Sequence, residues 1–276
     1  MNDRVKARLL QDARAAIGES PLWDRGAVIW TDPVARHLLR MDDDGFRAIP
    51  VDAAIWSLAS MPDGCVAGSL DDCFAHIRED GTITPGPAAE VSAGCRFNDM
   101  TAGADGVLWV GAMHRGVLAT RGAIYRAQGL GERPVRVAEG LGVPNGMKLS
   151  PDGATLFVVD TLSRTLLAYP VLGMGLGEPA IVTDFLDLPG KPDGMAMDSS
   201  GHFWVAMWGG GCIAEIASDG ATLRSVAVPA RHVSSLCFAG EDRLLVSTSR
   251  MRLSAHALAD QPQSGGLFEI VLEGSA

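Results

Sequence analysis

Six turn signals, spaced about forty residues apart, divide this chain of 276 residues into units of similar length. Their last turn residues are Gly26, Gly64, Gly106, Gly153, Gly201 and Asp242. The differences between consecutive numbers are 38, 42, 47, 48 and 41. Each turn is followed by a short run of strand-forming residues, and this period is typical of a propeller blade. The repeat therefore predicts an all-β fold, a six-bladed β-propeller with four-stranded antiparallel blades.

The composition agrees with many short strands joined by many turns. The chain has 33 Gly and 15 Pro without any low-complexity tract, and apolar residues at helical spacing are scarce. No linker or shift in composition divides it, so we expect a single β-propeller domain over residues 1–276. At the extreme N-terminus, Asp3–Ala15 is compatible with a helical turn or with an extended strand. Such a strand would close the ring against a late strand in Gly265–Val271.

Charge and cysteine usage exclude several classes of partner and location. The 23 Lys and Arg against 33 Asp and Glu give a net charge of −10, and there is no basic run, which argues against nucleic-acid binding. No apolar stretch approaches the roughly 20 residues of a membrane span. The amino terminus lacks the apolar core of a signal peptide. The five cysteines include no C-x-x-C pair, which favours free thiols and a cytoplasmic location.

Equivalent positions in the six units carry an unusual number of side-chain oxygens. Counting back eight residues from each turn, or seven in the first unit, gives Glu19, Trp56, Asn98, Asn145, Asp193 and Ser234. In a propeller such positions form a ring around the central channel. Asn-Gly and Asp-Gly are also ordinary turn sequences. The occurrence of Glu, Asp and two Asn in one register nevertheless favours a site.

This oxygen-rich ring indicates a metal site. Carboxylates crowded at the mouth of a channel repel each other unless a cation neutralises them. Glu19, Asn145 and Asp193 offer two charges and one neutral carbonyl, so we expect them to bind one divalent cation. Oxygen ligands suit Ca²⁺, Mg²⁺ or Mn²⁺, and Fe²⁺ and Zn²⁺ remain open. No His or Cys occupies the ring, which argues against a structural zinc site.

Several segments together resemble the SMP-30/gluconolactonase/regucalcin family. They occur in the family's order and span about Gly18 to Ile270, and they are Gly18–Trp23, Arg96–Asp99, Asn145–Gly146 with Ser150–Gly153, Pro192–Met195 with Gly201–Trp204, and Ser247–Arg250 with Gly265–Phe268. The resemblance implies a six-bladed propeller with one divalent metal at the channel mouth, and a lactonase acting on lactones of sugar acids.

The resemblance also implies a role for individual residues. Glu19, Asn145 and Asp193 are similar to the family's metal ligands, in agreement with the ring. Arg96 and Asn98 are similar to its substrate-binding residues, and Asp193 to its general base, which takes a proton from water. Asp99 is expected either to support the site through a hydrogen bond or to stabilise a turn.

Some residues near the expected pocket depart from the family or have no clear role. Some family members carry an acidic residue where this chain has His114 and Arg115, so the substrate here can differ in its hydroxyl pattern or carry negative charge. His114 itself is expected to be a solvated loop residue. Trp208 could wall the pocket. Trp56 either fills the channel or offers an apolar face to a sugar ring.

The leading hypothesis is a metal-dependent hydrolase that opens the lactone ring of a sugar acid. The expected partner is therefore a small-molecule sugar lactone, with no nucleic acid and no membrane, while the oligomeric state is left open. Two alternatives are hydrolysis of another ester or an organophosphate at the same metal site, and a non-enzymatic Ca²⁺-binding propeller. Channel-mouth oxygens in register favour catalysis, because a scaffold does not need them.

Overall fold

The recurring turn glycines adopt the backbone conformation that tight hairpins require. In the computed structural model, which describes residues 5–272, φ is 82° at Gly26, 81° at Gly64, Gly106 and Gly201, and 70° at Gly153. Glycine adopts such positive φ angles without a steric penalty. The spacing of these glycines therefore marks real hairpins, each joining the first and second strands of one unit.

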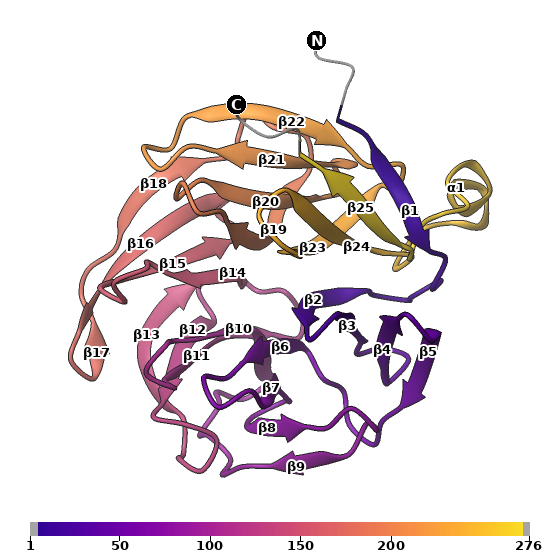
Figure 1. The fold of residues 1–276 in the computed structure, drawn as a ribbon. Helices are drawn as coiled ribbons and strands as arrows, with labels where there is room; N and C mark the ends of the chain where they lie inside the picture. Colours follow the sequence, from indigo (N-terminus) through magenta and orange to yellow (C-terminus); the bar gives the residue numbers. More distant parts are fainter. Residues whose placement is uncertain (1–4, 273–276) are drawn as a thin grey trace.

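The first half of the chain forms three antiparallel sheets of four strands, and a five-stranded sheet follows (Figure 1). The three sheets are β2 (Glu19–Asp24), β3 (Ala27–Asp32), β4 (His37–Asp42) and β5 (Gly45–Pro50); β6 (Ser57–Ser60), β7 (Val66–Ser69), β8 (Phe74–Ile77) and β9 (Ile83–Pro85); and β10 (Cys95–Ala102), β11 (Leu108–His114), β12 (Gly122–Ala127) and β13 (Val135–Leu141). The five-stranded sheet contains β14 (Pro144–Leu149), β15 (Thr155–Asp160), β16 (Thr165–Leu172), β17 (Gly175–Leu176) and β18 (Ala180–Asp184).

The last part of the chain forms an eight-stranded sheet. Its strands are β19 (Lys191–Met197), β20 (Phe203–Trp208), β21 (Cys212–Ile216), β22 (Thr222–Ala227), β23 (His232–Phe238), β24 (Arg243–Ser249), β25 (Leu267–Val271) and β1 (Ala7–Gln11). The run β19–β22 and the run β23–β24–β25–β1 meet where Trp208 of β20 pairs with His232 of β23. The expected all-β fold with four-stranded antiparallel sheets is thus confirmed.

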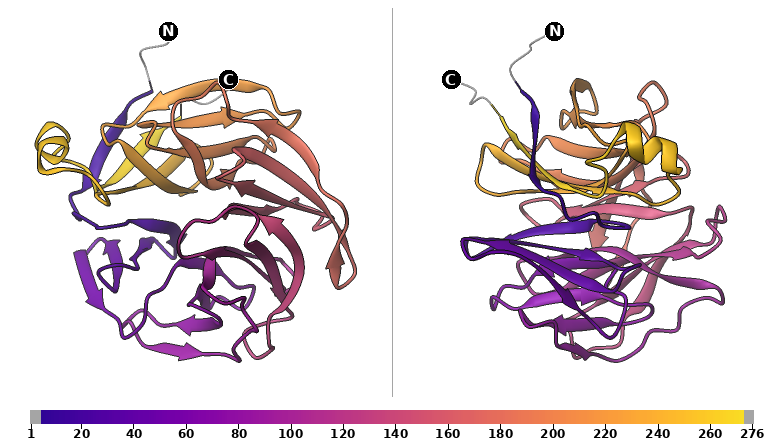
Figure 2. Two further views of the ribbon diagram at one scale, coloured as in Figure 1. Left: turned by 180° about the vertical axis from the view of Figure 1, so that it is seen from behind. Right: turned by 90° about the vertical axis from the view of Figure 1, so that its right-hand side faces the viewer.

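The N-terminal segment forms a strand rather than a helical turn. Strand β1 pairs antiparallel with β25, with Ala7 opposite Ile270 and Leu9 opposite Phe268. This pairing joins the two ends of the described chain, and Figure 2 shows β1 lying along the last strands. The first residues of the extreme N-terminus, Met1–Arg4, lie outside the described part. Helix α1 (Ala255–Asp260) is short, and no helix in residues 5–272 has the length and hydropathy needed to span a membrane.

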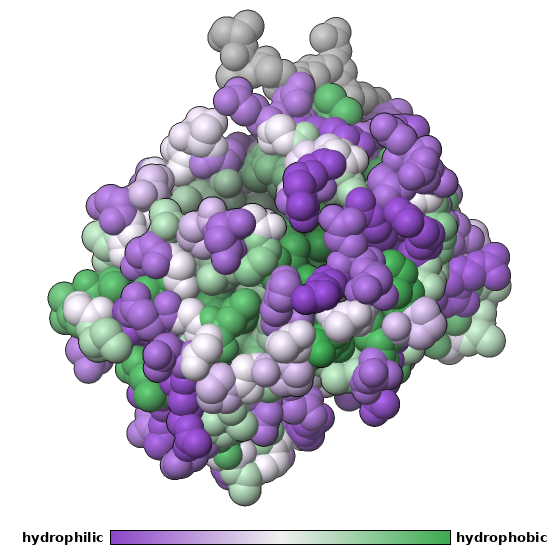
Figure 3. Space-filling view, turned by 60° about the horizontal axis from the view of Figure 1, so that its bottom comes forward, coloured by the Kyte–Doolittle hydropathy of each residue, from purple (hydrophilic) through white to green (hydrophobic). Residues whose placement is uncertain are grey.

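The first strands of successive units lie next to one another around a common centre (Figure 1). Contacts link β2 to β6, β6 to β10, β10 to β14, β14 to β19 and β19 to β23, and β23 in turn contacts β2. Apolar side chains fill the space between neighbouring sheets. One such cluster joins Phe74 of β8 to Phe97 of β10 and Leu108 of β11. On the surface in Figure 3, smaller apolar areas lie among hydrophilic residues.

Five of the six first strands are bulged where the sequence places the oxygen-bearing ring. The pairing with the second strand shifts between Glu19 and Leu22, Phe97 and Met100, Asn145 and Met147, Pro192 and Met195, and Val233 and Ser235. A bulge breaks the alternation of side chains between the two faces of a strand and redirects them. In β10 this turns two consecutive residues, Asn98 and Asp99, toward different cavities.

Candidate active site

The expected site residues meet at one cavity of about 950 Å³, which we call the front cavity. They come from strands of four different sheets and from the residue just before β6, and they are Glu19, Trp56, Arg96, Asn98, Asn145 and Asp193. The sixth position of the ring, Ser234, is fully buried and donates to the carbonyl of Gly18 instead. The register count therefore locates the site, although the roles of its residues are a separate question.

A chain of hydrogen bonds fixes the amide side chains of the site. Arg96 Nη1 donates to Asn98 Oδ1 at 2.8 Å, and Asn98 Nδ2 donates to Asn145 Oδ1 at 2.5 Å. Asn145 Nδ2 donates to the Thr161 hydroxyl at 2.8 Å, and this hydroxyl donates to the carbonyl of Pro192 at 2.8 Å. This series of hydrogen bonds links β10, β14 and the residue before Asp193, so these groups hold one another in place.

Two buried carboxylates, Glu19 and Asp193, lie in the site, and the charge of Arg96 offsets only part of the rise in the pKa of Glu19. Burial raises the pKa of Glu19 well above its ordinary value, and the charge of Asp193 raises it further. Burial, followed by the charge of Asp99, likewise raises the pKa of Asp193 well above its ordinary value. Within residues 5–272 neither Glu19 nor Asp193 forms a salt bridge. Ionised acids so placed are costly unless a cation compensates them.

This arrangement fits a divalent cation. Glu19 and Asp193 supply negative charge in a buried place, and Asn145 supplies a neutral oxygen whose orientation is fixed by Asn98 and Thr161. All three line the front cavity, so a cation there would also be open to a small molecule. Oxygen donors of this kind suit hard divalent ions, and the positive charge of such an ion would offset the burial and the repulsion that raise both pKa values.

Arg96 is held rigidly beside these groups. Its guanidinium carbon lies 3.4 Å from the centre of the Trp56 ring, and Trp56 Nε1 donates to Asp71 Oδ1 at 2.8 Å. Burial, followed by the charge of the nearby Arg115, lowers the pKa of Arg96 to about 10. Arg96 stays charged at neutral pH, so it presents a preorganised cation to a substrate oxygen. Trp56 thus lines the cavity and supports Arg96 at the same time.

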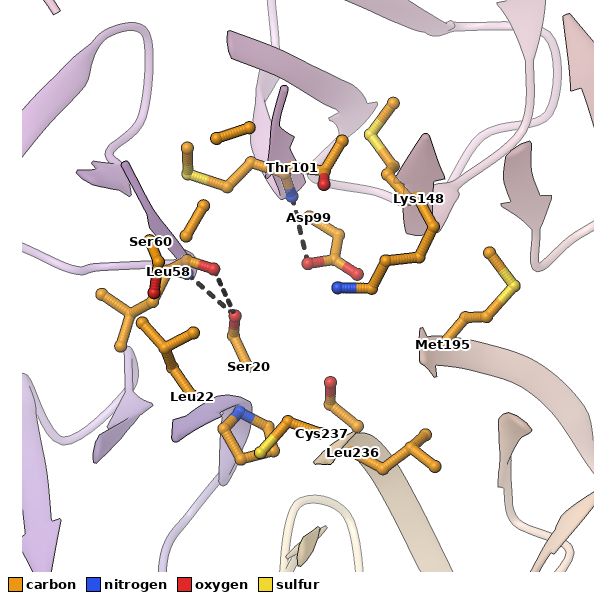
Figure 4. Close-up of a pocket in the computed structure, with 16 residues that line it drawn as sticks. Ser20, Leu22, Leu58, Ser60, Asp99, Thr101, Lys148, Met195, Leu236 and Cys237 are labelled. Atoms are coloured by element: carbon orange, nitrogen blue, oxygen red, sulfur yellow. Dashed lines mark hydrogen bonds between the residues drawn. The ribbon is translucent and has the colours of Figure 1, made fainter. Parts of the chain in front are cut away.

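A second, smaller cavity of about 230 Å³ lies behind the site and is lined by Asp99 and Lys148 (Figure 4). Asp99 Oδ1 accepts hydrogen bonds from the Ser57 hydroxyl at 2.6 Å and from the backbone N–H of Met100 at 3.1 Å. Burial raises the pKa of Asp99, while Ser57 and Lys148 act against this rise. Asp99 therefore bonds to a neighbouring side chain and to the local backbone, and its role in supporting the site stays a prediction.

Sequence reasoning missed Thr161, which anchors Asn145. The ring of equivalent positions contains residues of first strands only. In each antiparallel hairpin, however, the end of the second strand lies beside the start of the first strand. Pro144 pairs with Asp160, and Lys191 pairs with Trp208. Reading both ends of the hairpin would have placed Thr161 and Trp208 at the mouth.

The residues that depart from the family fall into two groups. Arg115 and Trp208 line the front cavity, and Trp208 stacks on His232 with ring centres 4.5 Å apart. His114 is half-buried, and its Nδ1 accepts a hydrogen bond from the backbone N–H of Gly116. It does not belong to the cavity lining, but it is the last residue of β11 and pairs with Cys95, so the expectation of a solvated loop residue is wrong.

A separate group of possible ligands, not expected from the sequence, lies away from this cavity. Asp198, His202 and Glu215 bring one ligand atom each within 4.8 Å of one another. Their bonds are already used, because Glu215 binds Arg224 and His202, while Asp198 accepts from Trp204 Nε1 at 3.0 Å. The group is explained as a network of ion pairs and hydrogen bonds that joins the turn between β19 and β20 to β21 and β22.

Comparison with known proteins places this chain in a family. A model described as the SMP-30/gluconolactonase/LRE-like region matches residues 17–250. The chain is 31% identical to an L-arabinolactonase of Azospirillum brasilense, covering 95% of this chain and 91% of the relative. It is also 31% identical to a pentonolactonase of Haloferax volcanii, covering 84% and 80%.

A solved structure agrees with these relatives. The structure of a calcium-binding protein, regucalcin, from Agrobacterium tumefaciens superimposes with a TM-score of 0.87 at 28% identity, over 98% of this chain and 96% of that one. The resemblance stated from the motifs is confirmed. The chain belongs to the SMP-30/gluconolactonase/LRE-like family.

Proposed function

We propose that this protein is a metal-dependent lactonase that converts the lactone of a sugar acid to the open-chain acid. That the protein is a lactonase agrees with the names of its relatives. The observation that carries the proposal is the pair of buried carboxylates, Glu19 and Asp193, beside the fixed amide of Asn145. A purely structural channel has no need for such an arrangement.

We further propose that the fold is a single six-bladed propeller. In this interpretation the eight-stranded sheet is two blades that touch at Trp208 and His232, and β1 completes the last blade. The closed sequence of contacts from β2 through β23 and back to β2 supports it.

Glu19, Asn145 and Asp193 are the residues that would hold one divalent cation, either Ca²⁺, Mg²⁺, Mn²⁺, Fe²⁺ or Zn²⁺. Such a cation supplies positive charge that polarises the lactone carbonyl. The similar regucalcin structure is described as that of a calcium-binding protein, which supports the binding of a divalent cation. The five cysteines are all free thiols in the structure, which supports a reducing, cytoplasmic location.

The residues of the chain divide the remaining work. Arg96 and Asn98 bind and orient the substrate, because Arg96 is fixed on Trp56 and donates to Asn98. Asp193 removes a proton from the attacking water at its carboxylate oxygen. The water oxygen bonds to the carbonyl carbon, the bond from that carbon to the ring oxygen breaks, and the proton passes to the ring oxygen. The new carboxylic acid then ionises and releases a proton to solvent.

This released proton provides the test. A pH-indicator assay over a panel of sugar-acid lactones is expected to show turnover that a chelator removes. Turnover restricted to phosphotriesters would support the alternative of an organophosphate hydrolase. A panel without turnover, together with tight Ca²⁺ binding, would support a non-enzymatic calcium-binding propeller and reject the lactonase.

A further inference from the structure

The lining of the front cavity is cationic in a protein whose net charge is −10. Its basic residues outnumber its acidic ones by six to two, and they are Arg96, Arg115, Arg164, Lys191, Arg231 and Arg252. The two acids are Glu19 and Asp193, which we assign to the metal. The rest of the lining therefore presents an excess of positive charge, opposite in sign to the whole protein.

Most of these cations lack a carboxylate partner. Within the described chain, Arg115 pairs with Asp71 at 2.7 Å, and the other five form no salt bridge. Basic residues elsewhere are often paired, as Arg224 is with Glu215 and Arg243 with Glu269. Unpaired cations gathered around one cavity focus a positive potential into it.

Three of the cations are free to meet a ligand. Lys191, Arg231 and Arg252 are exposed, and they come from the start of β19, the residue before β23 and the segment after β24. Arg164 is already engaged, since its guanidinium donates to the carbonyls of Phe185 and Leu188. The free cations thus lie along the mouth of the cavity on the side of β19, β23 and β24.

The same side offers an unused polar atom. Nδ1 of His232 is buried and has no hydrogen-bond partner in the part of the chain that the structure describes. His232 stacks on Trp208, with an angle of 13° between the rings, and both line the cavity. Buried polar atoms are normally satisfied, but this one has almost no accessible surface, so a ligand in the cavity would reach it only after the ring moves.

We propose that the lactone opened here carries an anionic substituent, a carboxylate, sulfonate or phosphate, bound by Lys191, Arg231 and Arg252. The inference rests on the proposed lactonase function. With the lactone carbonyl at Glu19, Asn145 and Asp193, a cavity of about 950 Å³ leaves room for a substituent. Arg and Lys recognise oxyanions through charge-assisted hydrogen bonds, and Arg does so with two parallel donors.

The test compares matched neutral and anionic lactones. The probes are gluconolactone, gluconolactone phosphorylated or sulfonated on its terminal carbon, and the lactone of the corresponding dicarboxylic acid. We expect kcat/KM for at least one anionic lactone to exceed the neutral value by about tenfold or more. This advantage should shrink when NaCl rises from about 20 to about 300 mM, because salt screens exposed charges. The member with the largest advantage identifies the anionic group.

Variants at the mouth separate this inference from the lactonase function itself. Arg231→Gln and Arg252→Gln should lower the ratio of anionic to neutral kcat/KM, and Arg78→Gln, an exposed arginine outside the cavity, should leave that ratio unchanged. A neutral lactone hydrolysed as well as every anionic one, with ratios insensitive to Arg231→Gln and Arg252→Gln, would overturn the inference and leave the lactonase intact. Failure to hydrolyse any lactone would overturn both.

Discussion

The side-chain amide of Asn98 donates to Oδ1 of Asn145 at 2.5 Å and thereby links β10 to β14, strands of neighbouring sheets. This bond orients a residue proposed to bind substrate and a residue proposed to bind the metal in a single contact. Thr161 completes the arrangement from the other side of Asn145. Disturbance of either partner is therefore expected to affect metal binding as well as turnover.

Thr161→Val should weaken metal binding. The valine keeps the shape of the side chain but removes the hydroxyl that accepts from Asn145 Nδ2, so the amide loses its fixed orientation. Groups that orient a metal ligand typically contribute about tenfold or more in affinity, and we expect Kd to rise by that factor. Calorimetric titration of metal into the metal-free protein measures this Kd. Thr165→Val, which removes a hydroxyl bonded to Ser163, serves as control, and equal affinities in both variants would contradict the assignment.

Asp193→Asn should stabilise the metal-free protein while abolishing activity. The pKa of Asp193 is raised above its ordinary 3.8, so the folded state resists its ionisation more than the unfolded state does. The resulting loss of stability is absent below the ordinary pKa, grows as pH rises through the raised pKa, and persists above it. Thermal unfolding in chelator should show little difference from the parent at about pH 3 and a higher Tm for the variant at about pH 8. A lower Tm at the higher pH would contradict this reasoning.

Arg96→Lys should impair substrate binding although the charge is kept. Lysine cannot reproduce the planar stack on Trp56 together with the bond to Asn98. We expect kcat/KM to fall by about ten- to a hundredfold, since one charged hydrogen bond contributes about 1.5–3 kcal/mol. Steady-state kinetics measure it, with Arg78→Lys on the surface as the matched control. Kinetics identical to those of the parent would exclude Arg96 from the substrate site.

Leu9→Asn should destabilise the fold by weakening the strand that joins the chain ends. Leu9 in β1 lies opposite Phe268 of β25 and packs against the buried cluster of the last sheet. Replacement of a partly buried leucine by a polar residue should lower the free energy of unfolding by about 2 kcal/mol. Denaturant titration measures it against Lys6→Asn, an exposed change next to the strand. Equal stabilities would mean that β1 contributes nothing to closure.

The fold could be predicted from the sequence because its signals are local. A glycine such as Gly106 or Gly153 has a positive φ whatever lies around it, and strand-forming runs follow at regular intervals. That regularity also fixed the register of Glu19, Asn145 and Asp193, which share one cavity. Counting along the chain sufficed for these residues, since each occupies an equivalent place in its own unit.

Other features depend on contacts between segments that are distant in the sequence, and no repeating sequence pattern marks them. Thr161 meets Asn145 because β15 returns antiparallel to β14, and Arg96 meets Trp56 across two sheets. The cations at the mouth come from the start of β19, the residue before β23 and the segment after β24, so no common register contains Lys191 and Arg252. The bulges that turn Asn98 and Asp99 toward separate cavities are likewise a property of strand pairing.

The most direct test of the central claim is to restore activity, by adding metal, to protein from which a chelator has removed the divalent ions. Protein freed of divalent ions should be inactive on the preferred lactone, and activity should return in proportion to added metal until one equivalent per chain is bound. Under the same conditions Asp193→Ala should bind metal weakly, and its turnover should stay about 10²–10⁴-fold below that of the parent. A lactone-hydrolysis rate equal to that of the parent, either in the metal-free protein or in Asp193→Ala, would contradict the account.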